Sequence, residues 1–214
     1  MFTAAIAHHT GITLTGWGLQ HFGFDKNETC QIAARNVWCG FFCTFFTWCG
    51  INSIFFEASV RPLQHALIGY IISDSVLIIR QPQFNTYENW CHHGLTSVLV
   101  GYSMMDSQRH YDLIHLGGIG EFSTIFYAVV DTFKHVPWLK KRYPDLNTAM
   151  RTLFLSLFVL LRVGWWTYVI VFATKVPPYV FVSFCFYGIL VLQYYWFYLI
   201  LRWIRKKVFL LYKQ

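Results

Sequence analysis

Charged residues are scarce in this chain. Only 13% of its 214 residues are Asp, Glu, Lys or Arg, about half the ~25% of an ordinary soluble domain. Hydrophobic residues make up 56% and aromatic residues 20%. A soluble fold of this size could not cover so much apolar surface with so few charges. The composition excludes a disordered chain, a secreted disulfide scaffold and most cytosolic enzymes. It predicts an all-α protein that crosses a membrane several times.

Three further features are missing. The six cysteines form no CxxC pair and mostly lie in apolar runs, so we expect neither a disulfide framework nor a zinc finger. The first 24 residues lack a basic start and an uninterrupted apolar core, so they do not predict a signal peptide. We interpret residues 1–30 as a short N-terminal segment that is interfacial or half-buried. The chain shows no internal repeat and no low-complexity linker.

Six apolar segments predict helices that cross the bilayer, a passage that takes about 20 residues. They are residues 37–56, 63–79, 90–105, 111–130, 152–173 and 180–203. The segment 111–130 is the most polar of the six and is rich in glycine. Together they predict a transmembrane domain over residues 31–210, with a basic tail at 204–214.

The basic residues predict the orientation of these segments. Three of the 17 lysines and arginines lie in odd-numbered loops, two lie within the segments, and the other twelve lie at the termini and in even-numbered loops. The twelve are Lys26, Arg35, Arg80, Lys134, Lys140, Lys141, Arg142, Arg151, Arg205, Lys206, Lys207 and Lys213. The positive-inside rule therefore places both termini in the cytosol, or in the matrix of a mitochondrion. Because this placement accounts for the net charge of +7, we expect no nucleic-acid partner.

Ionisable side chains inside apolar segments carry the functional argument. Each costs about 2.5–3.5 kcal/mol on insertion scales, and such residues commonly serve a function. The strongest candidates are Asp74, His92, His93, Glu121 and Arg162. Tyr70 lies one helical turn before Asp74, on the same face. His92 and His93 point about 100° apart on a helix, so at most one of them is expected to face a given site directly.

These residues leave two interpretations open. In the structural one, Arg162 neutralises Asp74 or Glu121 and locks the bundle, because buried charges need partners. In the other, the histidines and carboxylates form a polar pocket that performs acid–base or acyl-transfer chemistry or holds a lipid headgroup. Adjacent histidines rarely reach one ion together, so we expect no metal site. We interpret Asp112 and His115 as interfacial.

Five short sequences, taken in order, resemble the TLC-domain family, which includes the ceramide synthases and the translocating-chain-associated membrane proteins. They are GYIISD at 69–74, WCHH at 90–93, GEFST at 120–124, LLR at 160–162 and LQYYWF at 192–197. The chain is most similar to the small TLC-domain-containing subgroup related to the ceramide synthases. This resemblance implies a bundle of helices around a lipid-accessible cavity.

The resemblance also implies roles for single residues. In ceramide synthase relatives, a His pair and downstream acids surround the site where a fatty acyl group passes from acyl-CoA to a sphingoid amine. Carried over, His92, His93, Asp74 and Glu121 are the catalytic candidates, with one histidine as base or as transient acyl acceptor. Tyr70, Arg162 and Trp165 are the lipid-binding candidates. The chain departs from the ceramide synthase motif at Gly120 and Thr124, where that family has His and a second acid.

We therefore hold two functional hypotheses. The first is an enzyme of lipid metabolism that uses acyl-CoA as co-substrate and acylates a sphingoid base or a related lipid amine. The second is a non-catalytic lipid-binding or scaffold protein, an accessory subunit beside other membrane-protein subunits. Membrane lipids are the expected partners in both. The endoplasmic reticulum is the expected location, and the mitochondrial inner membrane is the alternative.

Overall fold

The protein is a bundle of helices. The computed structural model describes residues 2–21, 27–56, 61–105, 118–173 and 180–211, and the described residues contain no β-strand. The longer helices are α1 (Phe2–His21), α2 (Asn27–Phe56), α3 (Arg61–Arg80), α4 (Tyr87–Met105), α6 (Phe122–His135), α8 (Pro144–Leu157) and α10 (Val180–Leu211). The all-α fold class predicted from the sequence is confirmed.

Short helical segments connect the longer helices. The 3-10 turn η1 (Pro82–Phe84) precedes α4, and α7 (Pro137–Arg142) joins α6 to α8. After α8 the chain continues through η2 (Phe158–Trp165), α9 (Trp166–Tyr168) and η3 (Val169–Ala173). Both η2 and η3 are π-helical. Such widened turns are rare and are frequently found at functional sites.

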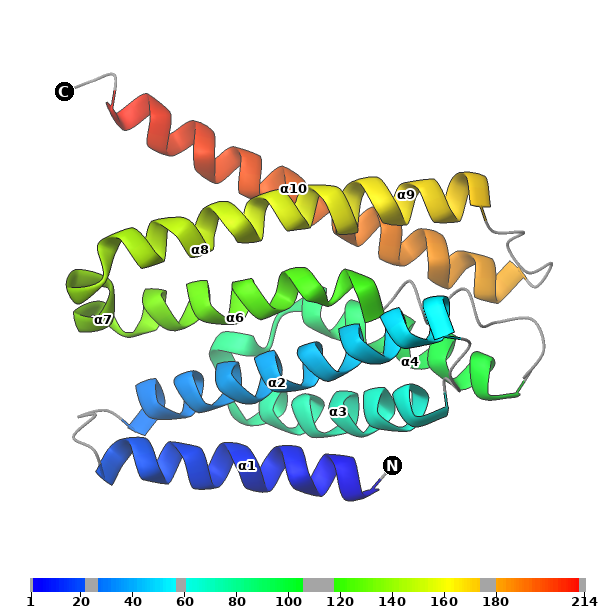
Figure 1. Ribbon diagram of the computed structural model, residues 1–214, viewed down its shortest axis with the longest axis horizontal. Helices are drawn as coiled ribbons and strands as arrows, with labels where there is room; N and C mark the ends of the chain where they lie inside the picture. The colour runs from blue at the N-terminus through cyan, green and yellow to red at the C-terminus, as the bar shows by residue number, and fades with distance from the viewer. Residues whose placement is uncertain (1, 22–26, 57–60, 106–117, 174–179, 212–214) are drawn as a thin grey trace.

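Among the described residues, the helices close into a ring around a central space. Helix α2 packs on α6, α6 on α8, η2 on α10, α10 on α4, α4 on α3, and α3 packs back on α2. In Figure 1 these helices lie roughly along the longest axis of the molecule, with α1 at one side of the stack. Many large apolar side chains on the outside, such as Trp48, Phe172 and Phe184, are exposed. That surface suits contact with lipid rather than with water.

The N-terminal residues, interpreted above as a short interfacial or half-buried segment, are largely helical. They form the 20-residue helix α1, which packs along α2 and α3. His8, in the middle of α1, is completely buried, with Nδ1 2.7 Å from the Ser73 hydroxyl oxygen. Its ring meets Phe42 and Tyr70 edge-on, each at a centroid distance of 5.0 Å. Helix α1 is therefore a packed part of the bundle.

Fewer helices qualify as membrane spans than the sequence predicted. By length and composition, three stretches among the described residues can cross a membrane, at 61–80, 144–172 and 180–206, instead of the six expected. The predicted segments 37–56 and 90–105 lie within α2 and α4. The start of the fourth segment, with Asp112 and His115, lies outside the described residues, and its helix α6 continues to His135.

The two ends of the helical bundle's chain path also differ from the one-sided arrangement predicted from the sequence. Figure 1 places the start of α1 and the end of α10 toward opposite ends of the long axis, whereas six spans would bring both termini to one side. The difference arises because α1 adds one more pass along the bundle. The end of the bundle that carries α7 is rich in basic residues, including Lys140, Lys141 and Arg142. We call this end the basic end.

Candidate functional site

The ring of helices encloses a cavity of about 420 Å³. Side chains from α2, α3, α4, α6, η2 and α10 line it. A volume of this size is typical of a site for a small molecule or for part of a lipid. We divide the cavity into a mouth toward the basic end, a waist, and a base toward the opposite end of the helices.

The three levels differ in chemistry. The mouth includes Asn36, Phe84, Asn89, Asp131 and Trp196. The waist includes Arg35, Cys39, Tyr70, Asp74, His92, His93, Glu121, Thr124, Arg162 and Gln193. The base is almost entirely apolar and includes Phe46, Leu63, Leu67, Leu99, Val100, Phe186 and Ile189. The cavity therefore places charged groups above a space that suits a hydrocarbon chain.

One buried ion pair joins α2 to α3 at the waist. Arg35 donates from Nε to Asp74 Oδ1 at 2.8 Å and from Nη2 to Asp74 Oδ2 at 2.7 Å. The Asp74 side chain is only 2% exposed. The Arg35 guanidinium also lies 4.0 Å above the Phe84 ring centroid. Two parallel hydrogen bonds fix the orientation of both side chains as well as their distance.

A second, partly buried ion pair joins η2 to the start of α6. Arg162 donates from Nη2 to Glu121 Oε1 at 3.0 Å and to Thr124 Oγ1 at 2.5 Å. Its Nε donates to Ser123 Oγ at 2.9 Å, and its Nη1 lies 3.4 Å from Gln193 Oε1. The guanidinium thus contacts four acceptors at once. An arginine held in this way is fixed in place and balances the charge of the buried carboxylate.

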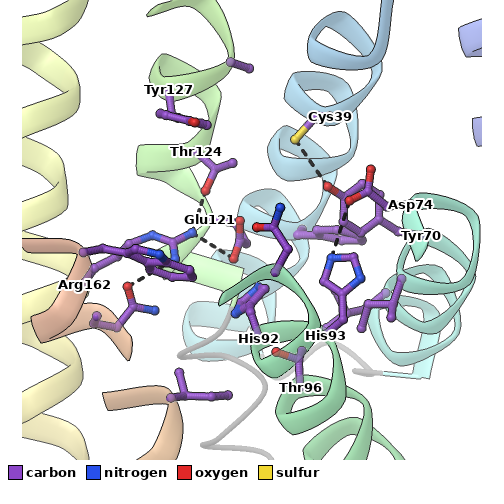
Figure 2. A pocket seen from close by; sticks show the side chains of 18 of the residues that line it. Cys39, Tyr70, Asp74, His92, His93, Thr96, Glu121, Thr124, Tyr127 and Arg162 are labelled. Atoms are coloured by element: carbon purple, nitrogen blue, oxygen red, sulfur yellow. Dashed lines mark hydrogen bonds and ion pairs between the residues drawn. The ribbon is translucent and has the colours of Figure 1, made fainter. Parts of the chain in front are cut away.

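The two histidines lie between these ion pairs (Figure 2). His93 uses both ring nitrogens, because Nδ1 is 3.0 Å from the Ser75 hydroxyl and Nε2 is 3.4 Å from Asp74 Oδ2. His92 points toward the side of Glu121, and its Nδ1 is buried without a hydrogen-bond partner among the described residues. The two rings face different groups, but both line the cavity, whereas their adjacency on a helix predicted that at most one would face a given site directly.

Two thiols of α2 lie between the Tyr70 hydroxyl and Glu121. The Cys39 sulfur lies 3.4 Å from the Tyr70 hydroxyl and 3.9 Å from the Cys43 sulfur. The Cys43 thiol in turn donates to Glu121 Oε2 at 3.5 Å. These contacts form a chain from Tyr70, which lies one turn before Asp74, to Glu121. All six cysteines are free, as the sequence predicted.

Glycines bring the backbone just before α6 close to its neighbours. A Cβ atom at Gly118 would lie 2.6 Å from the Phe46 carbonyl oxygen of α2, and one at Gly120 would lie 2.7 Å from Trp166 Nε1. Neither position has room for a side chain. The close approach that the glycine-rich sequence predicted before Glu121 is present, and it brings this carboxylate near the thiol of Cys43.

The structure gathers most of the predicted site residues in one place. The residues that line the cavity are Tyr70, Asp74, His92, His93, Glu121 and Arg162. Trp165 does not line it, and its ring stacks on Tyr168 at a centroid distance of 6.0 Å. The neighbouring Trp166 lines the cavity instead. Tyr70 shares a helix face with Asp74, but its hydroxyl contacts Cys39.

Sequence reasoning missed two polar groups of the cavity. Arg35 was assigned to a basic loop or terminus, but it lies inside α2 and is the partner of Asp74. The spacing of Arg35, Cys39 and Cys43 at intervals of four residues could have indicated that they share one face. At the mouth, the Asn36 side chain donates to Asp131 Oδ2 at 3.0 Å, and both residues are buried. Within the described part of the chain, no three His, Cys, Asp or Glu side chains are grouped so as to hold a metal ion.

Comparisons with known proteins point in the same direction. The family model of the TLC domain matches residues 26–202, which include every residue of the waist. No curated protein and no solved structure gave a match to the chain. A helical membrane bundle around a cavity agrees with the family match. The chain belongs to the TLC-domain family.

Proposed function

We propose that this protein transfers a fatty acyl group from acyl-CoA to the amine of a sphingoid base or a related lipid. The observation that carries the proposal is the position of His92, whose ring lies at the waist of the cavity while His93 is held by Ser75 and Asp74. A neutral imidazole with a free nitrogen can accept a proton or an acyl group. The apolar base below it suits the fatty acyl chain.

The residues of the waist take different roles in this proposal. His92 is the base or the transient acyl acceptor. His93 is a positioning residue, because both of its nitrogens already have partners. Asp74 and Glu121 hold the surrounding network through Arg35 and Arg162. These pairs keep two charged walls rigid on either side of the reacting group, which favours a fixed geometry for the reaction.

The transfer balances in either route. With His92 as base, it takes a proton from the lipid ammonium, and the amine nitrogen forms a bond to the thioester carbonyl carbon. The carbon–sulfur bond breaks, and the CoA sulfur leaves as a thiol after taking one proton. With His92 as acyl acceptor, the imidazole nitrogen displaces the thiol first and the amine then displaces the imidazole. Both routes yield an amide, free CoA thiol and one released proton.

A non-catalytic role is the second candidate. The observation in its favour is that all four charged groups of the waist are paired with one another, Arg35 with Asp74 and Arg162 with Glu121. Such pairs can serve to lock the bundle alone. In that case the cavity binds a membrane lipid without reaction, and the protein acts as a lipid-binding or scaffold subunit beside other membrane proteins.

The proposal includes a cellular setting. Acyl-CoA is made available in the cytosol-facing aqueous phase, and the basic end would attract its phosphates by long-range electrostatic steering. We place this end on the cytosolic side of the endoplasmic reticulum. The mitochondrial inner membrane, with the basic end in the matrix, is the alternative location.

Mass spectrometry of the intact, detergent-purified protein tests the proposal. The protein is incubated with a long-chain acyl-CoA, with and without sphinganine, and both the protein and the extracted lipids are measured. We expect N-acylated product, which His92→Gln abolishes while the variant still folds and still carries lipid. Arg80→Gln, an exposed substitution at the end of α3, serves as the control.

The outcomes separate the two candidates. An acyl adduct on the wild type that is absent from His92→Gln supports the acyl-acceptor route. Product without an adduct supports the base route. A lipid bound in fixed ratio to the protein, with neither adduct nor product and no effect of His92→Gln, would overturn the enzyme and leave the lipid-binding role.

A further inference from the structure

A second pocket adjoins the mouth of the cavity. It has a volume of about 320 Å³ and is lined by residues of η1, α4, α6 and α10 and of the η1–α4 connection. Six of its lining residues also line the main cavity, namely Phe84, Asn89, Tyr127, Asp131, Trp196 and Leu199. The two spaces are therefore neighbours that share a wall, and a lipid chain in the cavity can carry its headgroup in this mouth pocket.

The mouth pocket contains groups of both charges. Glu88 lines it from the first turn of α4, and Asp131 lines it from α6. Lys134 and His135 line it from the last turn of α6. The Lys134 side chain is 67% exposed and lies 3.8 Å from Asp131 Oδ1, so this contact leaves most of its ammonium surface open. A pocket that offers both a carboxylate and a cation suits a zwitterionic group.

Glu88 is positioned to meet an ammonium group. It lies four residues before His92, and the two side chains therefore share one face of α4, one turn apart. The Tyr195 hydroxyl donates to Glu88 Oε1 at 3.3 Å, which holds the carboxylate at the edge of the pocket. Hydrogen bonds from its own backbone amide and from Thr86 hold the pKa of Glu88 below its usual range, so it is ionised at neutral pH.

The aromatic residues of the mouth add to the same preference. Trp196 lines both spaces, and its ring meets the His92 ring edge-on at a centroid distance of 5.6 Å. An ammonium group near an indole face is attracted by the ring quadrupole. An ammonium held between Glu88 and Trp196 would thus lie beside His92, the residue that takes its proton in the proposed reaction.

From this arrangement we propose that the amine acceptor is a phosphoethanolamine-type lipid, with its primary ammonium at Glu88 and its phosphate at Lys134 and His135. The inference rests on the proposed acyl transfer and names its acceptor. Acyl-CoA donates the acyl group, the amine nitrogen bonds to the thioester carbonyl carbon, and the carbon–sulfur bond breaks. His92 carries the first ammonium proton to the leaving sulfur, and the second proton leaves through the mouth. The product is an N-acylated phospholipid and free CoA thiol.

Native mass spectrometry of the full chain with four lipids tests the headgroup preference. The lipids are phosphatidylethanolamine, phosphatidylcholine, phosphatidic acid and sphinganine, with matched chains where chains are present. We expect phosphatidylethanolamine and phosphatidylcholine to bind better than phosphatidic acid, which lacks the ammonium. Both should also bind better than sphinganine, which lacks the phosphate. Of these two phospholipids, only phosphatidylethanolamine should yield an N-acyl product with acyl-CoA, because the quaternary nitrogen of phosphatidylcholine cannot be acylated.

Two variants test separately the binding of the ammonium group and the binding of the phosphate. Glu88→Gln should lower the preference for phosphatidylethanolamine over phosphatidic acid by about threefold to fivefold, the size expected of a partly exposed ion pair. Lys134→Gln should lower the preference for phosphatidylethanolamine over sphinganine by a similar factor. Asp145→Asn, an exposed substitution outside the pocket, should change neither ratio.

Failure of this inference differs from failure of the proposed function. If sphinganine is acylated but phosphatidylethanolamine is not, and Glu88→Gln and Lys134→Gln leave both ratios unchanged, the acceptor assignment is overturned and the acyl transfer stands. If no amine is acylated under any condition, the proposed function is overturned. If phosphatidylethanolamine is still bound with the expected ratios, the mouth pocket binds the headgroup of a lipid that does not react, and the acceptor role falls.

Discussion

Arg35 and Asp74, which are 39 residues apart in the chain, form a bidentate ion pair between α2 and α3 with hydrogen bonds of 2.8 and 2.7 Å. Asp74 also lies 3.4 Å from His93 Nε2. This carboxylate therefore holds a cation on one side and a histidine on the other. Loss of Arg35 would leave a buried charge without its main partner and would also change the surroundings of His93.

The first prediction concerns this pair. We expect Arg35→Gln to lower the free energy of unfolding by about 3–5 kcal/mol, because it leaves Asp74 charged and unpaired in the bundle. The double variant Arg35→Gln/Asp74→Asn removes both charges and should recover part of this loss. Thermal unfolding in detergent measures both effects. Arg80→Gln is the matched control, and equal losses in the single and double variants would contradict the prediction.

The second prediction concerns Arg162. Lysine keeps the charge but cannot reach four acceptors with one rigid fork. We expect Arg162→Lys to cost about 1–3 kcal/mol in unfolding free energy and to lower turnover by displacing Glu121. Thermal unfolding and product formation are measured on the same sample. A variant with wild-type values in both would show that the fourfold contact is not needed.

The third prediction separates the two histidines. His92→Gln should abolish acyl transfer with little change in stability, because His92 Nδ1 has no partner among the described residues. His93→Gln should lower stability by about 1–3 kcal/mol, because it disturbs contacts with Ser75 and Asp74. Turnover and unfolding temperature together measure the difference. Equal residual turnover in His92→Gln and His93→Gln would contradict the assignment.

The fourth prediction uses the thiols as probes of the cavity. Cys39 lines the cavity, whereas Cys43 is only 2% exposed and does not line it. In variants that retain a single cysteine, a small maleimide should label Cys39 much faster than Cys43. A long-chain acyl-CoA should protect Cys39 from labelling. Cys91, which is exposed and does not line the cavity, should be labelled with no protection. Equal protection at Cys39 and Cys91 would show that the ligand does not enter the cavity.

The fifth prediction concerns pH at the mouth. Because the pKa of Glu88 is lowered, its carboxylate persists to lower pH than that of an ordinary glutamate. Any stability or ammonium binding that depends on this charge is present at neutral pH and is lost as the pH falls through the lowered pKa. We expect the preference for phosphatidylethanolamine over phosphatidic acid, corrected for titration of the phosphates, to decline only at the acidic end. Glu88→Gln should remove this pH dependence.

The sequence predicted much of the waist because charge is rare in this chain. Asp74, Glu121 and Arg162 stand out as single charges in apolar segments, and the cost of burying them implies an interior position. Of the two carboxylates proposed as partners of Arg162, Glu121 forms the ion pair. The sequence could not choose between Glu121 and Asp74, since the pairing depends on which helices are neighbours in the ring.

Other features depended on information that periodicity does not hold. Arg35 lies two residues before the first predicted segment, so its charge could be counted with a loop as readily as with a helix. Trp165 and Trp166 are neighbours in a π-helical stretch, where the register of the faces departs from that of an α-helix. The sequence therefore could not say which of the two faces the cavity. The mouth pocket depends on side chains from elements far apart in the chain.

The packing of helix α1 limits how far the N-terminus of the protein can be truncated. The TLC match begins at residue 26, beyond the end of α1, yet His8 of this helix fills the space behind Tyr70 and binds Ser73, the neighbour of Asp74. The boundary of the family domain is thus not the boundary of the cooperative folding unit. A chain trimmed to the matched residues would uncover the faces of α2 and α3 on which α1 packs, close behind the Arg35–Asp74 pair.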